Sequence, residues 1–150
     1  MSGFEIAPSR AADAPEVSVP PDFFAYDECV AELADPADRR HGYPFINCTQ
    51  CGPRYTLIAA LPYDRPNTSM AGFPLCAACR REYQDPLDRR FHAEPVACPV
   101  CGPHLVFVEP QRAPVTGDAA AVAAAVEILR TGRVLAVRGI GGYHLLCDAC

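Results

Sequence analysis

The cysteines of this chain form a pattern that occurs twice, at an interval of fifty residues. Cys29, Cys48 and Cys51 recur as Cys79, Cys98 and Cys101. The flanking residues recur as well: Glu32, Asp35-Pro36, Asp38-Arg39-Arg40 and Gly52-Pro53 match Glu82, Asp85-Pro86, Asp88-Arg89-Arg90 and Gly102-Pro103. The second copy has one more cysteine, Cys76, at the position that Tyr26 occupies in the first. The pattern therefore predicts one complete four-cysteine metal site and one copy that lacks a ligand.

The complete copy has the cysteine spacing of a structural zinc site, with the ligands Cys76, Cys79, Cys98 and Cys101. Two residues between paired cysteines allow one tight turn to present both sulfurs to an ion, which zinc binds tetrahedrally. A small proline-rich unit buries too little apolar area to fold unaided, and metal binding worth roughly 10–16 kcal/mol supplies the missing stability. The alternatives are an iron site or a reduced thiol pair without function. We also expect the glycines after Cys51 and Cys101 to adopt positive φ.

The first copy predicts a site with the ligands Cys29, Cys48 and Cys51. Tyr26 is a poor zinc ligand because the pKa of a phenol is near 10. Other groups that could complete the shell are water and the side chains of Asp22, Asp27 and His41. Three protein ligands and a water also describe a catalytic zinc. A degenerate structural site is the interpretation we favour.

Composition limits the class of protein. The chain has 150 residues, a net charge of −5 and nine cysteines, an odd number that fits a disulfide framework poorly. No apolar run is long enough to span a bilayer, and the first residues lack the features of a signal peptide, so we expect a cytoplasmic protein. Cytosolic thiols stay reduced, which favours metal sites. The acidic balance argues against a general nucleic-acid binder.

The chain divides into four parts: a linker or arm over 1–21, the tandem repeat over 22–105, a second linker over 106–117, and the start of an α/β domain over 118–150. In each copy of the repeat, a short helix follows the first cysteine position and ends at Asp-Pro, because proline disfavours helix in the residue before it. The connecting segment 55–74 is expected to be mostly loop with one short strand. The fold class is thus a small metal-stabilised tandem zinc-finger module followed by an incomplete α/β domain.

The last part of the chain reads as a helix, a strand and a glycine-rich turn. Residues 119–130 predict a helix with Val122, Val126 and Leu129 on one face, ended by Gly132. Residues 133–138 predict a buried strand, and 139–142 a turn. The chain stops at Cys150, before a sheet could close, so we expect this end to be truncated.

Three further features carry weaker signals. Arg138 with Gly139, Gly141 and Gly142 resembles a phosphate cradle. The arginine pairs 39–40 and 89–90 could touch phosphate, but each follows Asp-Pro-x-Asp, and local Asp–Arg bridging is the simpler use. Cys147 and Cys150 form a third pair; Cys147 is expected to be a buried small residue, and redox activity is the alternative.

Two segments resemble a known family closely. They are residues 79–103, CRREYQDPLDRRFHAEPVACPVCGP, and residues 43–56, YPFINCTQCGPRYT. Both resemble the tandem zinc-finger region of HypF, the carbamoyltransferase of [NiFe]-hydrogenase maturation. Residues 4–9 look like the joint after that family's acylphosphatase domain, and 134–149 like the first strand and loop of its YrdC-like nucleotide-binding domain. The resemblance runs over roughly 3–150.

The resemblance implies an enzyme that uses carbamoyl phosphate and ATP to make carbamoyl adenylate, and passes the carbamoyl group to the C-terminal cysteine of its partner HypE. It also implies that the cysteines of each copy bind zinc. Tyr26 departs from the family's cysteine, and Arg138 stands where the family usually has lysine, so charge is kept but the geometry differs. YrdC-like domains can also bind RNA, and we expect no membrane contact.

The chain lacks the catalytic domains of the family, so we expect this fragment to be structural and inactive, holding flanking catalytic domains in place. The rival interpretation is a free-standing zinc-ribbon module that binds nucleic acid or protein. The acidic balance and the α/β opening favour the fragment of a carbamoyltransferase.

Overall fold

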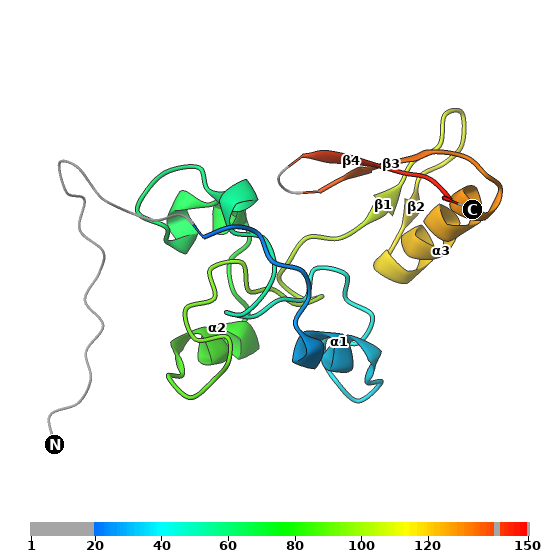
Figure 1. Cartoon of the computed structure of the whole chain (residues 1–150). Coiled ribbons are helices and arrows are strands. Elements are labelled where there is room, and N and C mark those ends of the chain that lie inside the picture. Colours follow the sequence, from blue (N-terminus) through cyan, green and yellow to red (C-terminus); the bar gives the residue numbers. More distant parts are fainter. Residues whose placement is uncertain (1–19, 140–141, 150) are drawn as a thin grey trace, which may run out of the picture.

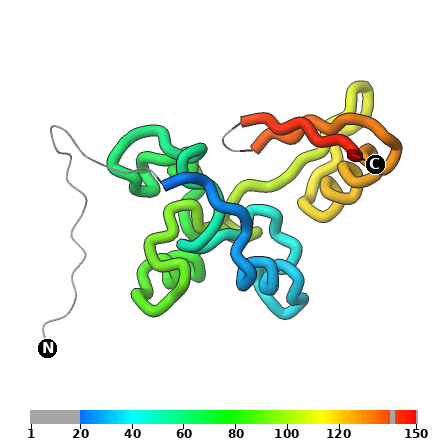
Figure 2. The backbone as a smooth tube through the Cα atoms, in the orientation of Figure 1, coloured from blue at the N-terminus to red at the C-terminus, as the bar shows by residue number. Residues whose placement is uncertain are grey.

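The computed structural model describes residues 20–139 and 142–149. Two lobes with similar backbone paths lie next to each other, each built around one short helix (Figures 1 and 2). A segment of 3-10 turns packs beside them, and an α/β part follows at the C-terminal side (Figure 1). The arrangement therefore separates the repeat from the segment that follows it.

Each copy of the repeat contains the predicted short helix, α1 over Asp27–Ala34 and α2 over Ala77–Gln84. Both end at the aspartate before proline, since Asp35 and Asp85 have extended backbone. The side chain of Asp35 then accepts a bond from the N–H of Ala37 at 2.9 Å, and Asp85 binds the N–H of Leu87 in the same way at 3.0 Å. The helices and their stops are confirmed.

The segment that joins the copies contains three 3-10 helices, η1 over Tyr55–Leu57, η2 over Arg65–Asn67 and η3 over Ser69–Gly72. The short strand expected here was wrong: the segment has only an isolated bridge between Ile58 and Thr68 among the residues that the structure describes. Prolines at 62, 66 and 74 remove backbone donors at close intervals, so no ladder can extend from this bridge.

A small apolar core joins this segment to both lobes. Its fully buried side chains come from the first copy, η1, η3 and the second copy, and are Tyr43, Leu57, Met70 and Ala97. The buried Arg65 strengthens the junction by donating to the carbonyls of Glu94, Val96 and Phe73 at 2.6, 2.9 and 2.7 Å. These bonds satisfy a buried guanidinium with two backbone oxygens of the second copy and one of the joining segment.

Residues 106–117, which we expect to link the two parts, carry two short strands. β1 over Val106–Phe107 pairs antiparallel with β2 over Val115–Thr116. Both strands contact α3, the helix over Asp118–Arg130. The carboxylate of Asp118 binds the backbone N–H of Leu105 at 2.7 Å and lies 3.0 Å from the ring of His104, which fixes the start of the helix beside the end of the repeat.

The predicted helix over 119–130 is confirmed, and Gly132 follows it with φ +75°. The face that carries Val122 and Val126 is exposed, whereas Ala121 is buried. In a helix with many alanines, periodicity leaves more than one apolar stripe. The helix packs against β1 and β2, and Ala121 is its buried residue.

Beyond α3, the strand β3 over Leu135–Arg138 pairs antiparallel with β4 over Tyr143–Leu146. We expected a buried strand here, but β3 alternates between half-buried and exposed residues and β4 is exposed throughout. Cys147, expected to be buried, is also exposed. Among the described residues, β3 contacts α3 while the side chains of β4 are exposed, so apolar composition alone overstated the burial of this hairpin.

Two predicted positions, Gly141 and Cys150, lie outside the described residues. In the part that is described, none of the helices combines the length and the apolar character needed to cross a membrane.

Candidate metal centres

The second copy brings its four predicted ligands into one cluster. The sulfurs of Cys76, Cys79, Cys98 and Cys101 all lie within 4.8 Å of one another. Cys98 is 3.8 Å from the sulfur of Cys76 and 3.7 Å from that of Cys101. Four thiolates around a zinc ion at about 2.3 Å are separated by about 3.8 Å, so the cluster has the dimensions of a tetrahedral zinc site.

Local folding explains this arrangement. Cys76 precedes α2 as its N-cap, and its sulfur accepts a hydrogen bond from the N–H of Cys79 at 3.5 Å. The sulfur of Cys98 accepts from the N–H of Val100 at 3.4 Å in the second turn. Cys79 and Cys98 are fully buried and the other two cysteines are half-buried. Backbone donors thus stabilise the thiolates that a cation requires.

The first copy gathers three sulfurs in the same way. Those of Cys29, Cys48 and Cys51 lie within 4.8 Å of one another, with Cys51 at 3.6 Å from Cys29 and 3.9 Å from Cys48. All three side chains are fully buried. The cluster offers three corners of a tetrahedron and can hold a metal ion with one further ligand.

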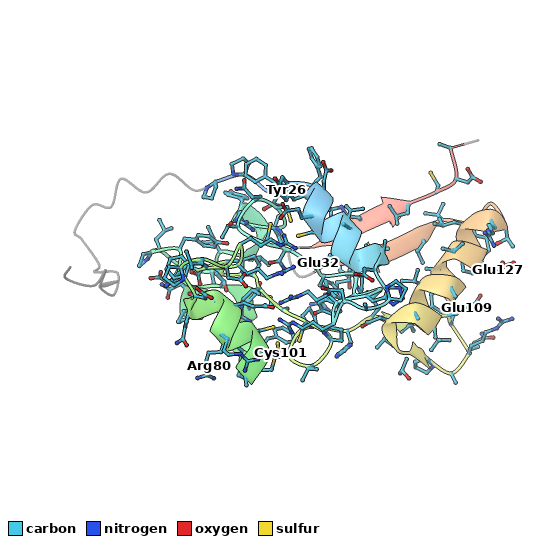
Figure 3. The ribbon with its side chains drawn as sticks, turned by 90° about the horizontal axis from the view of Figure 1, so that it is seen from below. Tyr26, Glu32, Arg80, Cys101, Glu109 and Glu127 are labelled. Atoms are coloured by element: carbon cyan, nitrogen blue, oxygen red, sulfur yellow. The ribbon has the colours of Figure 1, made fainter. Side chains whose placement is uncertain are left out.

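Tyr26 occupies the backbone position in the first copy that Cys76 occupies in the second, but its side chain does not belong to the cysteine cluster. It is the N-cap of α1, with extended backbone (φ −76°, ψ 145°) like that of Cys76 at the start of α2 (φ −64°, ψ 165°). Tyr26 is 41% exposed at the start of α1 (Figure 3). The scaffold for a fourth thiolate is therefore present although the thiolate is missing.

The three side chains considered as a fourth ligand do not join the cluster. Among the described residues, no carboxylate or imidazole belongs to the group formed by the first copy's sulfurs, so Asp22, Asp27 and His41 are not ligands in this conformation. Asp22 has another task, since its carboxylate accepts from the N–H groups of Arg54 at 2.6 Å and Thr56 at 3.3 Å.

The glycines after the second cysteine turn of each copy serve different needs. Gly52 has φ +90°, as expected. Gly102 does not have positive φ, so the prediction was wrong for this position. Lack of space explains why glycine is needed at this position. A Cβ at Gly102 would lie 2.1 Å from the hydroxyl of Tyr43 and 2.6 Å from the Cβ of Ala97. The close approach of Tyr43 could not be foreseen from the repeat, since the second copy has Ala93 at the matching position.

The arginine pair of the first copy binds the second copy. Arg39 donates from Nε and Nη2 to the carboxylate of Glu82 at 3.2 and 2.6 Å, and from Nη2 to the sulfur of Cys79 at 3.3 Å. Arg40, almost fully buried, binds Glu82 at 2.5 Å and Cys79 at 3.5 Å, and its Nε donates to the carbonyl of Ala97 at 2.9 Å. One cluster ligand thus receives two guanidinium groups from the neighbouring lobe.

The second copy returns these contacts. Arg89 donates to the sulfur of Cys29 at 3.0 Å and pairs with Glu32 at 2.7 Å. Arg90 binds Glu32 as well, and its Nε donates to the carbonyl of Asn47 at 3.0 Å. Local Asp–Arg bridging was therefore wrong. The aspartates bind backbone N–H groups of their own turn, as Asp38 does with that of Arg40 at 2.7 Å.

Sequence reasoning missed Glu32 and Glu82 as functional residues. Each lies one helical turn after a cysteine, so Cys29 and Glu32 share one face of α1, and Cys79 and Glu82 share one face of α2. In Figure 3, Glu32 projects from α1 on the side of the second lobe. Their recurrence at fifty residues was the signal, because the repeat preserves them along with the cysteines and arginines.

The electrostatics of the clusters favour a bound cation. Burial raises the pKa of Cys29 to about 12 and that of Cys79 to about 12, although arginine contacts oppose the rise. Burial alone would also raise the pKa of Cys76, but the N–H of Cys79 and the neighbouring thiols lower it to about 7. Several buried thiolates close together need a positive partner, so metal binding would displace protons from these thiols.

The other predicted site residues lie elsewhere. Arg138 ends β3, and its guanidinium lies 5.8 Å from the ring centre of Tyr143 on the paired strand. Gly139 and Gly142 close the hairpin with a bond of 2.7 Å from the N–H of Gly139 to the carbonyl of Gly142. Neither these residues nor Cys147 joins a cysteine cluster.

Comparison with known proteins assigns the repeat. A family model described as the HypF finger matches residues 27–58 and 75–108. Carbamoyltransferase HypF2 of Cupriavidus necator is 56% identical over 148 residues, which are 98% of this chain and 18% of that protein. Carbamoyltransferase HypF of Rhodobacter capsulatus is 54% identical over 98% of this chain and 19% of its own length. The chain thus spans less than a fifth of these curated relatives.

Solved structures agree with these matches. The crystal structure of HypF from T. kodakarensis is 50% identical, with a TM-score of 0.80 over 91% of this chain and 18% of its own. A full-length HypF in a phosphate- and nucleotide-bound form is 47% identical, with a TM-score of 0.77 over the same shares. The similarity in fold therefore extends beyond the two matched finger segments.

Proposed function

Because this chain belongs to the HypF family, we propose that its two cysteine clusters hold structural zinc ions within a carbamoyltransferase. The observation that carries the proposal is the cluster of Cys76, Cys79, Cys98 and Cys101, whose sulfur separations match those of a tetrahedral zinc thiolate site. A bound zinc ion would tie the N-terminus of α2 to the turn at residues 98–101 and so supply stability that the small apolar core lacks.

The two sites differ in strength in this proposal. The second copy has four thiolates, whereas the first has three and completes its shell with water or another exogenous ligand. All three sulfurs of the first copy are buried, which supports a structural role over a catalytic one. We expect tight zinc binding by the four cysteines of the second copy and weaker zinc binding by the three cysteines of the first copy.

The reaction that we propose for the whole enzyme is the one that the family resemblance implies. Carbamoyl phosphate and ATP give carbamoyl adenylate, and the carbamoyl group passes to the C-terminal cysteine of a HypE-like protein in [NiFe]-hydrogenase maturation. The relatives' name, carbamoyltransferase, supports the transfer of a carbamoyl group. In this scheme the finger region holds flanking catalytic domains in position and has no carbamoylating activity of its own.

Two lesser assignments complete the proposal. The residues after α3 are the start of a YrdC-like domain, in which Arg138, Gly139 and Gly142 would line a phosphate site; the exposed apolar side chains of the hairpin, such as Leu145, support contact with further protein. The compartment is the cytoplasm, where reducing conditions keep the cysteine clusters available for metal.

A nucleic-acid-binding zinc ribbon is the weaker alternative. Its main sequence feature was the arginine pairs, and both pairs bind glutamates and cysteine sulfurs of the neighbouring copy. A titration with RNA or DNA at two salt concentrations tests it, since phosphate contacts make affinity fall steeply with salt.

Two measurements test the proposal. Metal analysis of the purified chain should find one tightly held zinc per chain and a second that a mild chelator removes; two equally tight zinc ions would contradict the asymmetry, and none would contradict the zinc sites. Pyrophosphate exchange into ATP, driven by carbamoyl phosphate, should be absent with the 150-residue chain. Exchange activity would overturn the structural role.

A further inference from the structure

The contacts between the two copies recur with the same fifty-residue spacing as the sequence. Arg39 binds Glu82 and Cys79 of the second copy, and fifty residues later Arg89 binds Glu32 and Cys29 of the first. The carbonyls that accept from Arg40 and Arg90 are also fifty residues apart, at Ala97 and Asn47. The reciprocal arginine contacts therefore follow from the sequence repeat. In each direction they include a cysteine sulfur of the other lobe's metal cluster.

The geometry of each contact is that of a fork. Cysteine and glutamate occupy one helix face a turn apart, and one guanidinium spans both: Nε of Arg39 is 3.2 Å from Glu82, and its Nη2 is 3.3 Å from the sulfur of Cys79. The planar fork of arginine suits such a double acceptor, whereas lysine offers a single point of charge. Glu82 thus positions the arginine that approaches the sulfur.

Charge explains what the fork does for a bound metal. A divalent ion with four thiolates carries two net negative charges, and with three thiolates it carries one. In each lobe, the guanidinium groups that contact a ligand sulfur come from the other lobe. Hydrogen bonds to ligands commonly change metal affinity by about 10–100-fold. Each lobe consequently supplies part of the environment that retains the neighbour's ion.

We propose that the two metal sites are coupled, in that the arginine pair of each finger (one copy of the repeat with its cysteine cluster) helps to retain the metal ion of the other finger. Loss of the metal ion or of the arginine contacts in one finger therefore weakens metal binding in its neighbour. The loop that carries Arg39 and Arg40 lies between Cys29 and Cys48, so an ion held by these cysteines fixes the loop. The inference rests on the proposed zinc sites and adds that they are interdependent.

The test follows each site separately in the full chain loaded with cadmium-113. A four-thiolate and a three-thiolate cadmium site give different NMR resonances, and the variants Cys101→Ser and Cys51→Ser assign them. A chelator is then added and the loss of each resonance is timed. Arg39→Gln, which changes only the first finger, should speed release from the four-thiolate site of the second finger by about tenfold, with a smaller change at its own site.

Two controls refine this test. Arg80→Gln removes an exposed arginine on the side of α2 away from the first lobe (Figure 3) and should leave both release rates unchanged. Arg89→Gln is the mirror variant and should speed release from the three-thiolate site. Arg39→Lys should be intermediate, because lysine cannot reach Glu82 and Cys79 with a planar fork.

A metal-side experiment does not depend on any arginine variant folding well. Cys48→Ser weakens the first site alone, and the coupling predicts faster release from the four-thiolate site although no residue of the second finger has changed. Equal rates for this variant and the unmodified chain overturn the coupling, as does an effect of Arg39→Gln confined to the first finger. Absence of both resonances from the unmodified chain overturns the proposed zinc sites, and the coupling with them.

Discussion

Arg89 donates a hydrogen bond to the sulfur of Cys29 over 3.0 Å, although the two residues are sixty positions apart and belong to different copies of the repeat. The matching bond from Arg39 to Cys79 measures 3.3 Å. The two lobes are thus joined through their cysteine clusters as well as through the apolar core around Tyr43 and Leu57. Several changes to individual residues should reveal how this junction works.

Replacing Tyr26 by cysteine should restore a four-thiolate site in the first copy. The backbone at Tyr26 matches that at Cys76, since both residues are N-caps with extended φ and ψ. A structural zinc site with four ligands is worth roughly 10–16 kcal/mol, so one thiolate contributes about a quarter of this free energy. One added thiolate should therefore raise zinc affinity on the order of 100-fold. Competition with a chromogenic chelator measures it.

The converse variant is Cys76→Tyr, which gives the second copy the ligand set of the first. It should lower affinity by a similar factor and make the release of the two ions alike. If Tyr26→Cys left affinity unchanged, the N-cap position would not be a ligand position in the first copy.

Glu82→Gln should destabilise the zinc-loaded chain by roughly 1.5–3 kcal/mol, the range for hydrogen bonds to charged groups. Burial alone would raise the pKa of Glu82, but its bonds from Arg40 and Arg39 lower it to about 2 from a usual value of 4.5. A carboxylate with a lowered pKa stabilises the fold above pH 4.5 and loses this contribution as the pH falls toward 2.

Urea unfolding of both proteins between pH 3 and pH 7 checks this dependence. The difference in unfolding free energy should be constant above about pH 5 and shrink below pH 4.5. Glu127→Gln, on the exposed side of α3, is the matched control and should have little effect (Figure 3). A difference that grew at low pH would contradict the ion pair.

Glu94→Gln should have the opposite effect. Glu94 is buried, and burial raises its pKa even though the hydroxyl of Tyr83 donates to it at 2.9 Å. A carboxyl with a raised pKa costs stability as the pH rises above its unfolded value near 4.5. The amide removes that cost, so thermal unfolding at pH 7 should show a gain on the order of 1 kcal/mol. Tyr83→Phe should instead destabilise, because it leaves the carboxylate without this donor.

Gly102→Ala should be the most damaging glycine substitution in the repeat. The new Cβ would overlap the hydroxyl of the buried Tyr43, at a cost of about 1–3 kcal/mol or more. Gly42→Ala should cost less, because a Cβ there meets nothing within 4 Å and only its φ of +67° is strained. Denaturant unfolding ranks the two variants, and Tyr43→Phe should partly rescue Gly102→Ala by removing the overlapping atom.

The parts of the structure that sequence could predict are those that local chemistry fixes. Cysteine spacing predicted both clusters, and the Asp-Pro stops predicted the ends of α1 and α2. The Gly132 stop likewise follows from backbone preferences within a few residues. Each of these features depends on neighbours along the chain.

The features that were missed depend on contacts between distant segments. The targets of Arg39 and Arg89 are about forty and sixty residues away, and nothing in a local motif distinguishes them from the nearby aspartates. The need for a small residue at Gly102 comes from Tyr43 in the other copy. The packing of α3 against β1 and β2 likewise joins elements whose pairing the periodicity of the helix does not reveal.

The crossed arginines also make each copy of the repeat depend on the other. Although the first copy has three clustered cysteines rather than four, it supplies Arg39 and Arg40 to Cys79 and Glu82 of the second copy. A deletion of that copy would strip two cations from an intact neighbour. The two copies therefore form one structural unit, whose junction depends on the arginines thirteen and fourteen residues after Tyr26 rather than on a cysteine at that position.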